Sequence, residues 1–493
     1  MNEQNRNQRG HQRSKARSEH QGNFSKNAPS ARTKKATSTR EVVFEVLTTV
    51  VDADAYANLV LPAVLKRHDF ASVDRGFITE LTYGTLRLQG RYDAIIEVCA
   101  KRKISEIDPK VRIILRLGAH QLLAMRVPPH AAVNETVALA RNKTGVGSAQ
   151  FVNAILRRIS EKELEAWLDY LEETLPDEVS RYAATESHPR WIVRALKDSL
   201  VANGRPADEL LSVLEAQNRT PKVNLVARPG LIDQAELNEI KNLKPGNWVK
   251  TAYTLNGGDP QNIKAVSEGR LGVQDEGSQI VTEVFLQAPV SGKDEDWLDM
   301  CAGPGGKPAL LGAYAAGRGA RVVANEVQEH RAKLVAKSVK ALPSGVIERI
   351  QVWDGRDIGN QEPESYDRVL LDAPCTGLGA LRRRPESRWR KTPADLTHLR
   401  ILQSELLYSA LLAVRKGGVV GYVTCSPHLV ETIEVVKETL QKFPAADFEI
   451  IDLKALLHQV AGPEIPSGNE KHLQLWPHLH KSDAMHLSLI RKR

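Results

Sequence analysis

The spacing of hydrophobic positions changes along the chain, and each spacing predicts a different kind of structure. From about residue 40 to residue 160, apolar residues recur every three or four positions, as they do on one face of a helix. In VRIILRLGAHQLLAM this face contains Val111, Ile114, Leu115, Gly118, Leu122 and Met125. Strand-like alternation is scarce in this region, so we predict an all-α domain over residues 40–160, packed as a small bundle.

The next two stretches differ from this pattern. Residues 161–220 remain helical in spacing but are rich in charge, which predicts a helical connector. Residues 221–290 contain short apolar runs broken by Gly and Pro, as in KVNLVARPG. This texture predicts a small α+β subdomain.

From residue 291 to residue 493, strand-like and helix-like segments alternate. Strands are predicted at 296–300, 321–327, 347–354, 367–373 and 417–425, and helices at 307–316, 327–342 and 396–416. Such alternation is typical of a doubly wound, Rossmann-like α/β domain with a mostly parallel sheet. Ligands of such sheets bind at the carboxyl ends of the strands.

Composition narrows the class of protein. The chain has 493 residues, enough for roughly three domains, and 42% of them are hydrophobic. We find no run of about 18 apolar residues, and the first ten residues are polar and basic. The four cysteines form no C-x-x-C pair and have no zinc-site spacing. We therefore expect a cytoplasmic protein with no membrane partner and no metal.

A net charge of +8 favours a polyanionic partner, although only weakly. Much of this charge lies in the first forty residues, where ten Lys and Arg face two acids, Glu3 and Glu19. We expect residues 1–39 to be a disordered basic tail. Such a tail either attracts RNA phosphates without sequence preference or simply aids solubility.

Candidate ligand groups follow three of the predicted strands. The first strand runs into a glycine-rich turn over Asp299–Lys307, where a ligand can approach backbone N–H groups closely. The turn is neither G-x-G-x-x-G nor a Walker loop, so S-adenosylmethionine fits better than a phosphate ligand. Glu326 lies at the end of the second strand and suits a ribose, and Asp354 lies at the end of the third and suits an adenine amino group. Each acid alone is expected to be a surface residue or helix cap, but three at successive strand ends favour a site.

Two cysteines lie at the ends of the fourth and fifth strands. Cys375 comes shortly after the fourth strand, in Asp372-Ala373-Pro374-Cys375, and Cys425 ends the fifth, in Thr424-Cys425. They are expected to face one crevice. A thiolate suits methylation of carbon 5 of cytosine, because that carbon becomes nucleophilic only after addition at carbon 6.

The helical region resembles the NusB-like RNA-binding domain. The resemblance is carried by DRGFITELTYGTLR, ILRLGAHQLLAMRVPPHAAVNE and FVNAILRRI, in this order. It implies RNA contact, with Arg87, Arg116, Arg157 and Arg158 as candidates for the RNA backbone. Each of these arginines could instead simply solvate the end of a helix.

The stretch from about residue 270 to the end resembles the RNA (cytosine-5) methyltransferases of the Sun/Fmu family. The matching elements are VQDEGSQ at 273–279, DMCAGPGGK at 299–307, DAPCTG with GALRRRP at 372–385, and VTCSP at 423–427. With the helical domain, the resemblance covers about 450 of the 493 residues. It implies that the cofactor is S-adenosyl-L-methionine and that the substrate is RNA. Small-subunit ribosomal RNA is the expected substrate. We expect a monomer.

The resemblance also implies a role for each matching residue. Cys425 is the implied nucleophile, Cys375 assists product release, and Asp372 also contacts the cytosine ring. Lys307 helps to order the site, and Arg382 and Arg383 approach the RNA backbone. The implied cofactor-binding residues are Cys301, Ala302, Gly303, Pro304, Gly305, Gly306, Lys307, Glu326, Asp354 and Asp372.

The chain departs from the family pattern at two places. The usual Glu-Asn reads Glu431-Thr432, and the usual Asp-Gly-[Met/Phe]-Phe reads Asp483-Ala484-Met485-His486. These changes put substrate placement in doubt more than chemistry. Three other functions were weighed: a DNA cytosine methyltransferase, a nucleotide-dependent oxidoreductase and a non-catalytic RNA-binding factor. The second cysteine and the NusB-like segment argue against the DNA methyltransferase, and hydride transfer leaves the loop composition and the paired cysteines of an oxidoreductase unexplained. Intact Cys375 and Cys425 argue against a non-catalytic factor.

Overall fold

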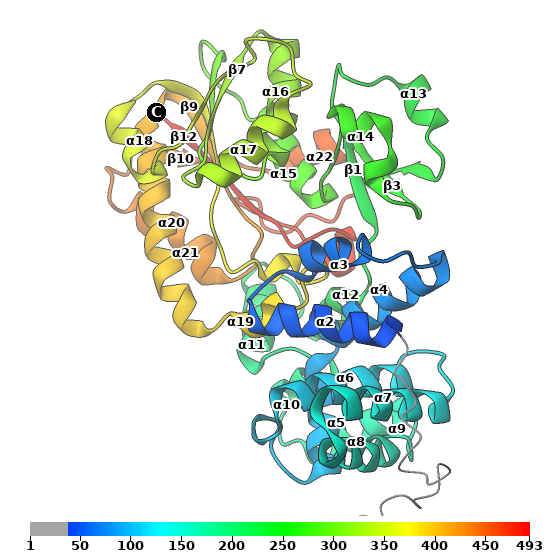
Figure 1. Cartoon of the computed structure of the whole chain (residues 1–493). Coiled ribbons are helices and arrows are strands. Elements are labelled where there is room, and N and C mark those ends of the chain that lie inside the picture. Colours follow the sequence, from blue (N-terminus) through cyan, green and yellow to red (C-terminus); the bar gives the residue numbers. More distant parts are fainter. Residues whose placement is uncertain (1–37) are drawn as a thin grey trace, which may run out of the picture. The chain divides into compact units, whose positions relative to one another are not determined.

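The computed structural model describes residues 38–493, which divide into two units (Figure 1). The first contains residues 38–55, Val60–Thr85 and Tyr92–Trp167, and the second contains Tyr56–Leu59, Leu86–Arg91 and Leu168–Arg493. The predicted basic tail lies outside the described residues, except that Ser38 and Thr39 begin the first helix. No helix within residues 38–493 combines the length and the apolar character needed to cross a membrane.

The first unit is helical throughout, as the apolar spacing predicts. Asp108 starts the central helix α6 by accepting hydrogen bonds from the N–H groups of Lys110 and Val111. Ile113 and Leu117 are buried together with four residues of the predicted face (Val111, Ile114, Leu115 and Gly118), so α6 is surrounded by its neighbours. The other two, Leu122 and Met125, are only partly buried, and Met125 lies beyond the end of the helix. The helices are α2 (Ser38–Asp52), α3 (Ala57–Leu65), α4 (Ser72–Arg87), α5 (Gln89–Ala100), α6 (Pro109–Leu123), α7 (Pro129–Thr144) and α8 (Val146–Ile159).

Four helices lead into the large α/β part of the second unit: α9 (Leu164–Thr174), α10 (Glu178–Thr185), α11 (Arg190–Ala202) and α12 (Leu210–Asn218). The apolar faces of α10, α11 and α12 pack with Leu378, Leu381 and Trp476 in one cluster. Ser199 on α11 donates to the carbonyl of Pro427 over 2.5 Å. The connector therefore supports loops at the carboxyl end of the large sheet.

A four-stranded antiparallel sheet follows, in the order β2-β3-β1-β4. Its strands are β1 (Val223–Ala227), β2 (Leu243–Pro245), β3 (Ala252–Leu255) and β4 (Leu271–Val273), with helices α13 (Gln234–Glu239) and α14 (Lys264–Glu268). Gln279 lies in the next helix along the chain. Its side-chain amide donates to the carbonyls of Leu225 and Gln274 and so connects that helix to this sheet.

The large sheet has the strand order β10-β12-β9-β8-β5-β6-β7, with β11 paired to β12. All five predicted strands are present and parallel: β5 (Asp296–Asp299), β6 (Arg321–Asn325), β7 (Ile347–Gln351), β8 (Tyr366–Asp372) and β9 (Val414–Thr424). Three strands beyond the predicted set complete it: β10 (Phe448–Ile450), β11 (Leu473–Gln474) and β12 (His486–Lys492). β12 runs antiparallel to β9.

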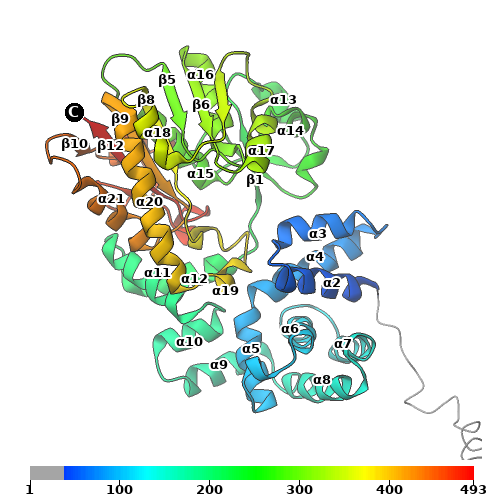
Figure 2. The same ribbon diagram turned by 60° about the vertical axis from the view of Figure 1, so that its left-hand side comes forward.

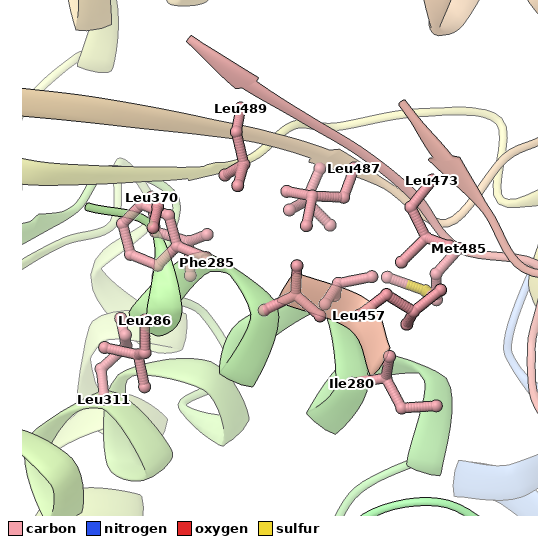
Figure 3. Packing of buried hydrophobic residues seen from close by; sticks show 14 of the residues in the cluster. Ile280, Phe285, Leu286, Leu311, Leu370, Leu457, Leu473, Met485, Leu487 and Leu489 are labelled. Carbon is pink, nitrogen blue, oxygen red and sulfur yellow. The ribbon is translucent and has the colours of Figure 1, made fainter. Parts of the chain in front are cut away.

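Helices cover both faces of this sheet (Figures 1 and 2). Alternate residues of β9 point to opposite faces: Val419 and Val423 lie in one hydrophobic cluster, and Val420 and Tyr422 lie in the other. The first cluster includes α15 (Glu276–Gln287), α16 (Gly306–Arg318) and α22 (Lys454–Ala461), and Figure 3 shows part of it. The second includes α18 (Gly355–Gln361), α20 (Pro393–Ala413) and α21 (Ile433–Leu440). The remaining helices are α17 (Glu329–Val339), α19 (Ser387–Arg390) and α23 (Pro477–His480). The sheet is therefore doubly wound, as predicted.

Candidate active site

The predicted site residues gather at the carboxyl end of the large sheet. The chain first builds β5, β6 and β7 in one direction and then returns to place β8 on the other side of β5. At such a reversal, doubly wound sheets bind ligands in the crevice outside the carboxyl ends of the strands. The glycine-rich turn follows β5, and Asp372 ends β8.

Close packing explains the glycine at position 303. A Cβ atom there would lie 2.1 Å from Glu326 Oε2, and that oxygen instead accepts a hydrogen bond from the Gly303 N–H over 3.1 Å. Arg331 completes the contact, since its guanidinium lies 3.3 Å from the same oxygen. Glu326 is 3% exposed, so the loop and the second strand end form one rigid unit.

Asn325 joins three strand ends, a role that the sequence pattern does not reveal. Its amide donates to the carbonyls of Met300 and Trp353 over 3.0 and 3.1 Å, and its oxygen accepts from the Trp353 N–H. Asp354, in contrast, caps α18 and forms an ion pair with Arg356. Its side chain is thus engaged as a helix cap, the alternative that the sequence left open.

Asp299 begins the glycine-rich motif but is not among the cofactor-binding residues that the family resemblance implies. Its surroundings nevertheless point to a ligand. Its carboxyl group is fully buried and makes no hydrogen bond of normal geometry within the described residues. Burial, together with the nearby Asp372 carboxylate, raises its pKa to about 8. A buried acid that lacks a donor fits a ligand that carries positive charge and N–H groups, such as the amino-acid end of S-adenosylmethionine.

Lys307, at the start of α16, donates to Asp372 Oδ2 over 2.7 Å. Burial disfavours its ammonium group, but the negative charges of Asp372 and of the Cys425 thiolate outweigh this effect and raise its pKa. Cys301, beside the same loop, has a pKa raised well above the usual thiol value by burial and then by Asp299. The neutral thiol is therefore the favoured form of Cys301.

Cys375 and Cys425 meet in the crevice although 50 residues separate them. Their sulfur atoms lie 3.4 Å apart. The hydrogen bond from the Cys375 thiol lowers the pKa of Cys425, and Lys307 acts in the same direction against burial and Asp372. The pKa of Cys375 is raised by that shared hydrogen bond, by burial and by the negative charges around it. The thiolate is thus favoured on Cys425, as a nucleophile requires.

The two arginines expected at the RNA backbone have different surroundings. The side chain of Arg382 is 9% exposed, and its guanidinium lies 3.1 Å from Asp483 and 3.4 Å from Asp275. The side chain of Arg383 is 45% exposed and also pairs with Asp483. Arg382 is therefore part of a buried ion network, whereas Arg383 has surface available to a ligand.

The two departures from the family pattern are accommodated locally. The hydroxyl of Thr432 donates to the carbonyl of His428 over 3.0 Å, which satisfies it inside the protein. Ala484 is buried, and its N–H donates to the Gly379 carbonyl over 3.0 Å. His486 is also buried and bonds to Ser488 over 3.0 Å. Thr432, Ala484 and His486 therefore all fit within the protein, through local hydrogen bonds or burial.

The arginines of the helical region are mostly engaged within the chain. Arg87 is buried and donates to Thr220, Arg116 forms a two-pronged ion pair with Asp93, and Arg158 donates to the carbonyl of Cys99. Arg157 is exposed. Among residues 38–493 we find no cluster of three or more His, Cys, Asp or Glu that could hold a metal ion.

Comparison with known proteins identifies both parts of the chain. Residues 37–161 match the NusB family, and residues 285–491 match the family 16S rRNA methyltransferase RsmB/F. Rv1407 of Mycobacterium tuberculosis, a candidate methyltransferase, is 44% identical over 454 residues, which cover 92% of this chain and 96% of the relative. The ribosomal RNA small subunit methyltransferase B of Pseudomonas putida is 30% identical, over 85% of this chain and 92% of the relative.

Solved structures agree on the fold. The crystal structure of PH0851 covers 92% of this chain and 98% of its own, with a TM-score of 0.71 at 23% identity. NSun6 from Pyrococcus horikoshii, solved with the S-adenosylmethionine analogue SFG, covers 62% of this chain and 99% of its own, with a TM-score of 0.51 at 17% identity. The sequence-based resemblance is confirmed: the chain is an S-adenosyl-L-methionine-dependent methyltransferase and belongs to the 16S rRNA methyltransferase RsmB/F family.

Proposed function

We propose that this methyltransferase modifies carbon 5 of a cytosine in small-subunit ribosomal RNA, with Cys425 as the nucleophile and Cys375 assisting product release. The observation that carries the proposal is the pair of thiols 3.4 Å apart, with Lys307 beside Cys425. A methyltransferase acting on a heteroatom has no need of two adjacent thiols at its strand ends. The name of the Pseudomonas putida relative supports the choice of substrate.

The chemistry begins at Cys425. Its thiolate forms a bond to carbon 6, and the electrons of the carbon 5–carbon 6 double bond make carbon 5 nucleophilic. Asp372, held by Lys307, is placed to hydrogen-bond the ring and to favour a proton on nitrogen 3. Carbon 5 then forms a bond to the methyl carbon that S-adenosylmethionine, when bound, would supply, and the bond from that carbon to the sulfonium sulfur breaks, which leaves S-adenosylhomocysteine.

Release requires two further bond changes. The proton on carbon 5 must pass to a base, and its bonding electrons restore the double bond as the carbon 6–sulfur bond breaks and Cys425 leaves as thiolate. Cys375 lies within contact of that sulfur and carries a proton that it can share with the departing thiolate. This position supports its role in release rather than in attack.

The cofactor is proposed to lie along the glycine loop, over residues 301–307, with its ribose at Glu326. Asp372 lies at the neighbouring strand end, and Asp299 is added to the set because its buried carboxyl makes no hydrogen bond of normal geometry within the described residues. Asp354 remains a proposed adenine contact, provided that it can release Arg356. Arg383 is the better candidate for RNA contact than Arg382 because more of it is exposed. A single-stranded or flipped base is required for access to the crevice.

The test is transfer of labelled methyl to unmodified small-subunit ribosomal RNA, with the modified nucleoside identified by mass spectrometry. Wild type, Cys425→Ala and Cys375→Ala are compared, and denaturing gels reveal covalent protein–RNA adducts. We expect 5-methylcytosine with wild type, no product with Cys425→Ala, and a trapped adduct with Cys375→Ala. If Cys425→Ala traps the adduct instead, then Cys375 is the nucleophile and Cys425 assists release. Absence of transfer by wild type to any RNA would leave a binding factor as the better reading.

A further inference from the structure

A buried glutamate lies behind the two cysteine loops and has no part in the chemistry above. Glu431 is 0% exposed and sits in the short turn that follows Cys425. We propose that Glu431, through Thr376 and Gln403, is a positioning residue that holds the Cys375 loop against Cys425 for the release step. This inference rests on the proposed function, because it assigns a cause to the placement of Cys375.

The carboxylate of Glu431 is directed at the residue next to Cys375. Its Oε1 accepts the Thr376 N–H over 2.7 Å, and its Oε2 accepts the Thr376 hydroxyl. One side chain thus binds both the backbone and the side chain of Thr376, which fixes that residue in position and in rotation. Hydrogen bonds to a charged acceptor are roughly twice as strong as neutral ones.

Gln403, on α20, holds the other side of the same loop. Its amide donates to the carbonyl of Pro374 over 2.7 Å and to Glu431 Oε1 over 3.2 Å. Pro374 and Thr376 flank Cys375, so the loop is gripped on both sides of the thiol. Gln403 is itself 0% exposed, which keeps water from competing for these bonds.

A second connection ties this grip to the loop of the nucleophile. The Thr376 and Ser426 hydroxyls lie 3.2 Å apart, and Ser426 directly follows Cys425. Because Thr376 gives its proton to Glu431, Ser426 must donate to Thr376, while Ser426 itself accepts from the His428 N–H over 3.2 Å. The residue after each cysteine is therefore bonded to the residue after the other.

Glu431 also acts on charge. Together with Asp372 it adds negative potential at Cys375, whose pKa is raised by its hydrogen bond to Cys425, by burial and by these carboxylates. Cys425 has Lys307 nearby instead. The glutamate thus favours the protonated form of Cys375, which is the form that donates to Cys425.

The kinetic consequence is specific. Loosening the grip removes Cys375 from contact with the sulfur that must leave, which slows release by Cys425 more than it slows attack. Release then becomes slow, so the covalent adduct accumulates and kcat falls more than KM rises. A side chain that merely stabilises the fold would lower the amount of active protein without changing the fraction trapped as adduct.

The experiment uses the full chain with small-subunit ribosomal RNA and S-adenosylmethionine. Thr376→Val removes the hydroxyl at nearly constant volume, and Thr376→Ser restores it. Gln403→Met and Glu431→Gln are second routes to the same defect, in case one variant fails to fold. Thr282→Val is the matched control, since Thr282 is equally buried and bonds only to the Ser278 carbonyl within α15. Cys375→Ala is the positive control for adduct.

We expect Thr376→Val and Glu431→Gln to raise the adduct fraction by about tenfold and to lower kcat by a similar factor. Thr376→Ser should behave as wild type, and Thr282→Val should trap no more adduct than wild type. Alkylation of Cys425 by iodoacetamide at pH 7 should also slow in Thr376→Val, a readout that needs no RNA.

The two possible failures are distinguishable. If Cys375→Ala traps adduct but Thr376→Val, Gln403→Met and Glu431→Gln do not, the positioning role is wrong and the proposed function stands. If Cys375→Ala traps no adduct, the proposed role of Cys375 is wrong, and the positioning role falls with it. Equal loss of activity in Thr376→Val and Thr376→Ser, without adduct, would also overturn the inference.

Discussion

The Lys307 ammonium lies 2.7 Å from Asp372 Oδ2 and so joins the start of α16 to the end of β8. The lysine side chain is 10% exposed and the aspartate side chain 30% exposed. The same ammonium raises the fraction of Cys425 present as thiolate. One cation thus links the glycine-rich turn to the end of β8 and favours the thiolate form of Cys425.

Lys307→Met is expected to impair both order and chemistry. Loss of the cation raises the pKa of Cys425 and leaves Asp372 without its partner, so we expect kcat/KM to fall on the order of a hundredfold and stability to fall by about 1–3 kcal/mol. Iodoacetamide alkylation of Cys425 across pH and urea unfolding measure the two effects. Lys333→Met is the control, because Lys333 is 70% exposed and pairs only within α17. An unchanged alkylation profile would contradict the activating role.

The two cysteines should titrate as a pair. Cys375→Ala removes the hydrogen bond that lowers the pKa of Cys425, so the pKa of Cys425 should rise towards the free-thiol value. We expect alkylation of Cys425 at pH 7 to slow by about tenfold. Cys375→Ser keeps a donor and should recover most of the rate. If Cys425 alkylates equally fast in all three proteins, the hydrogen bond does not activate it.

Asp299→Asn should stabilise the protein without cofactor and weaken cofactor binding. Because the pKa of Asp299 is raised to about 8, the folded chain keeps this proton while the unfolded chain releases it near pH 4. Stability is therefore lost as pH rises from about 4 to 8 and is level above that range. Asparagine carries no such loss, so the variant should be more stable by about 1–4 kcal/mol at pH 7.

Urea unfolding of wild type and Asp299→Asn at pH 5, 7 and 8.5 checks this prediction, because the difference between them should grow with pH. Calorimetric titration with S-adenosylmethionine should show affinity reduced by about tenfold or more. A variant that binds the cofactor normally would remove Asp299 from the binding site.

Local sequence pattern was sufficient for the five parallel strands. Val369–Leu371 in β8 and Val419–Val423 in β9 form unbroken apolar runs because both faces of the sheet are covered, and β8 ends at Asp372 while β9 ends directly before Cys425. β10 and β11 are only three and two residues long, and the antiparallel position of β12 depends on pairing with β9 about sixty residues earlier. Such pairing has no local signal in the sequence.

The misses within the site have the same cause. Asp299 becomes notable only when its neighbours are placed and none of them provides a donor of normal geometry. The burial of Arg382 depends on Asp483, 101 residues further along the chain. Asp354 differs from these two residues, because its bond to the Arg356 N–H joins near neighbours in the chain. A helix-capping role for Asp354 was therefore among the interpretations that the sequence allowed.

Gly303→Ala should disrupt the cofactor loop. The new methyl group would lie 2.1 Å from Glu326 Oε2, so the loop or the glutamate must move and the Gly303 N–H bond is lost. We expect stability to fall by about 1–3 kcal/mol and affinity for S-adenosylmethionine to fall by at least about tenfold. Gly317→Ala, in α16 and facing open space, should instead be neutral or stabilising by up to about 1 kcal/mol. Equal affinity in the two variants would mean that the loop tolerates the shift.

Substitutions of Arg382 and Arg383 are expected to have different effects, on stability for Arg382 and on RNA binding for Arg383. Arg382→Met leaves the buried carboxylates of Asp275 and Asp483 with Arg383 alone, so we expect a loss of about 3–5 kcal/mol at neutral pH. Burial and Asp483 raise the pKa of Asp275 to about 6 in the intact network, so protonation below that pH relieves the repulsion between the two acids. The loss should therefore be smaller at pH 5 than at pH 8, as urea unfolding can measure.

Arg383→Met should act mainly on RNA. Its exposed guanidinium can meet a phosphate, so the variant should weaken RNA binding and reduce the slope of log affinity against log salt by about one. Arg382→Met, in the fraction that remains folded, should keep the wild-type slope, because a buried arginine releases no counterion from RNA. Filter binding at several salt concentrations distinguishes the two. A reduced slope in Arg382→Met with unchanged stability would instead place Arg382, and not Arg383, at the RNA backbone.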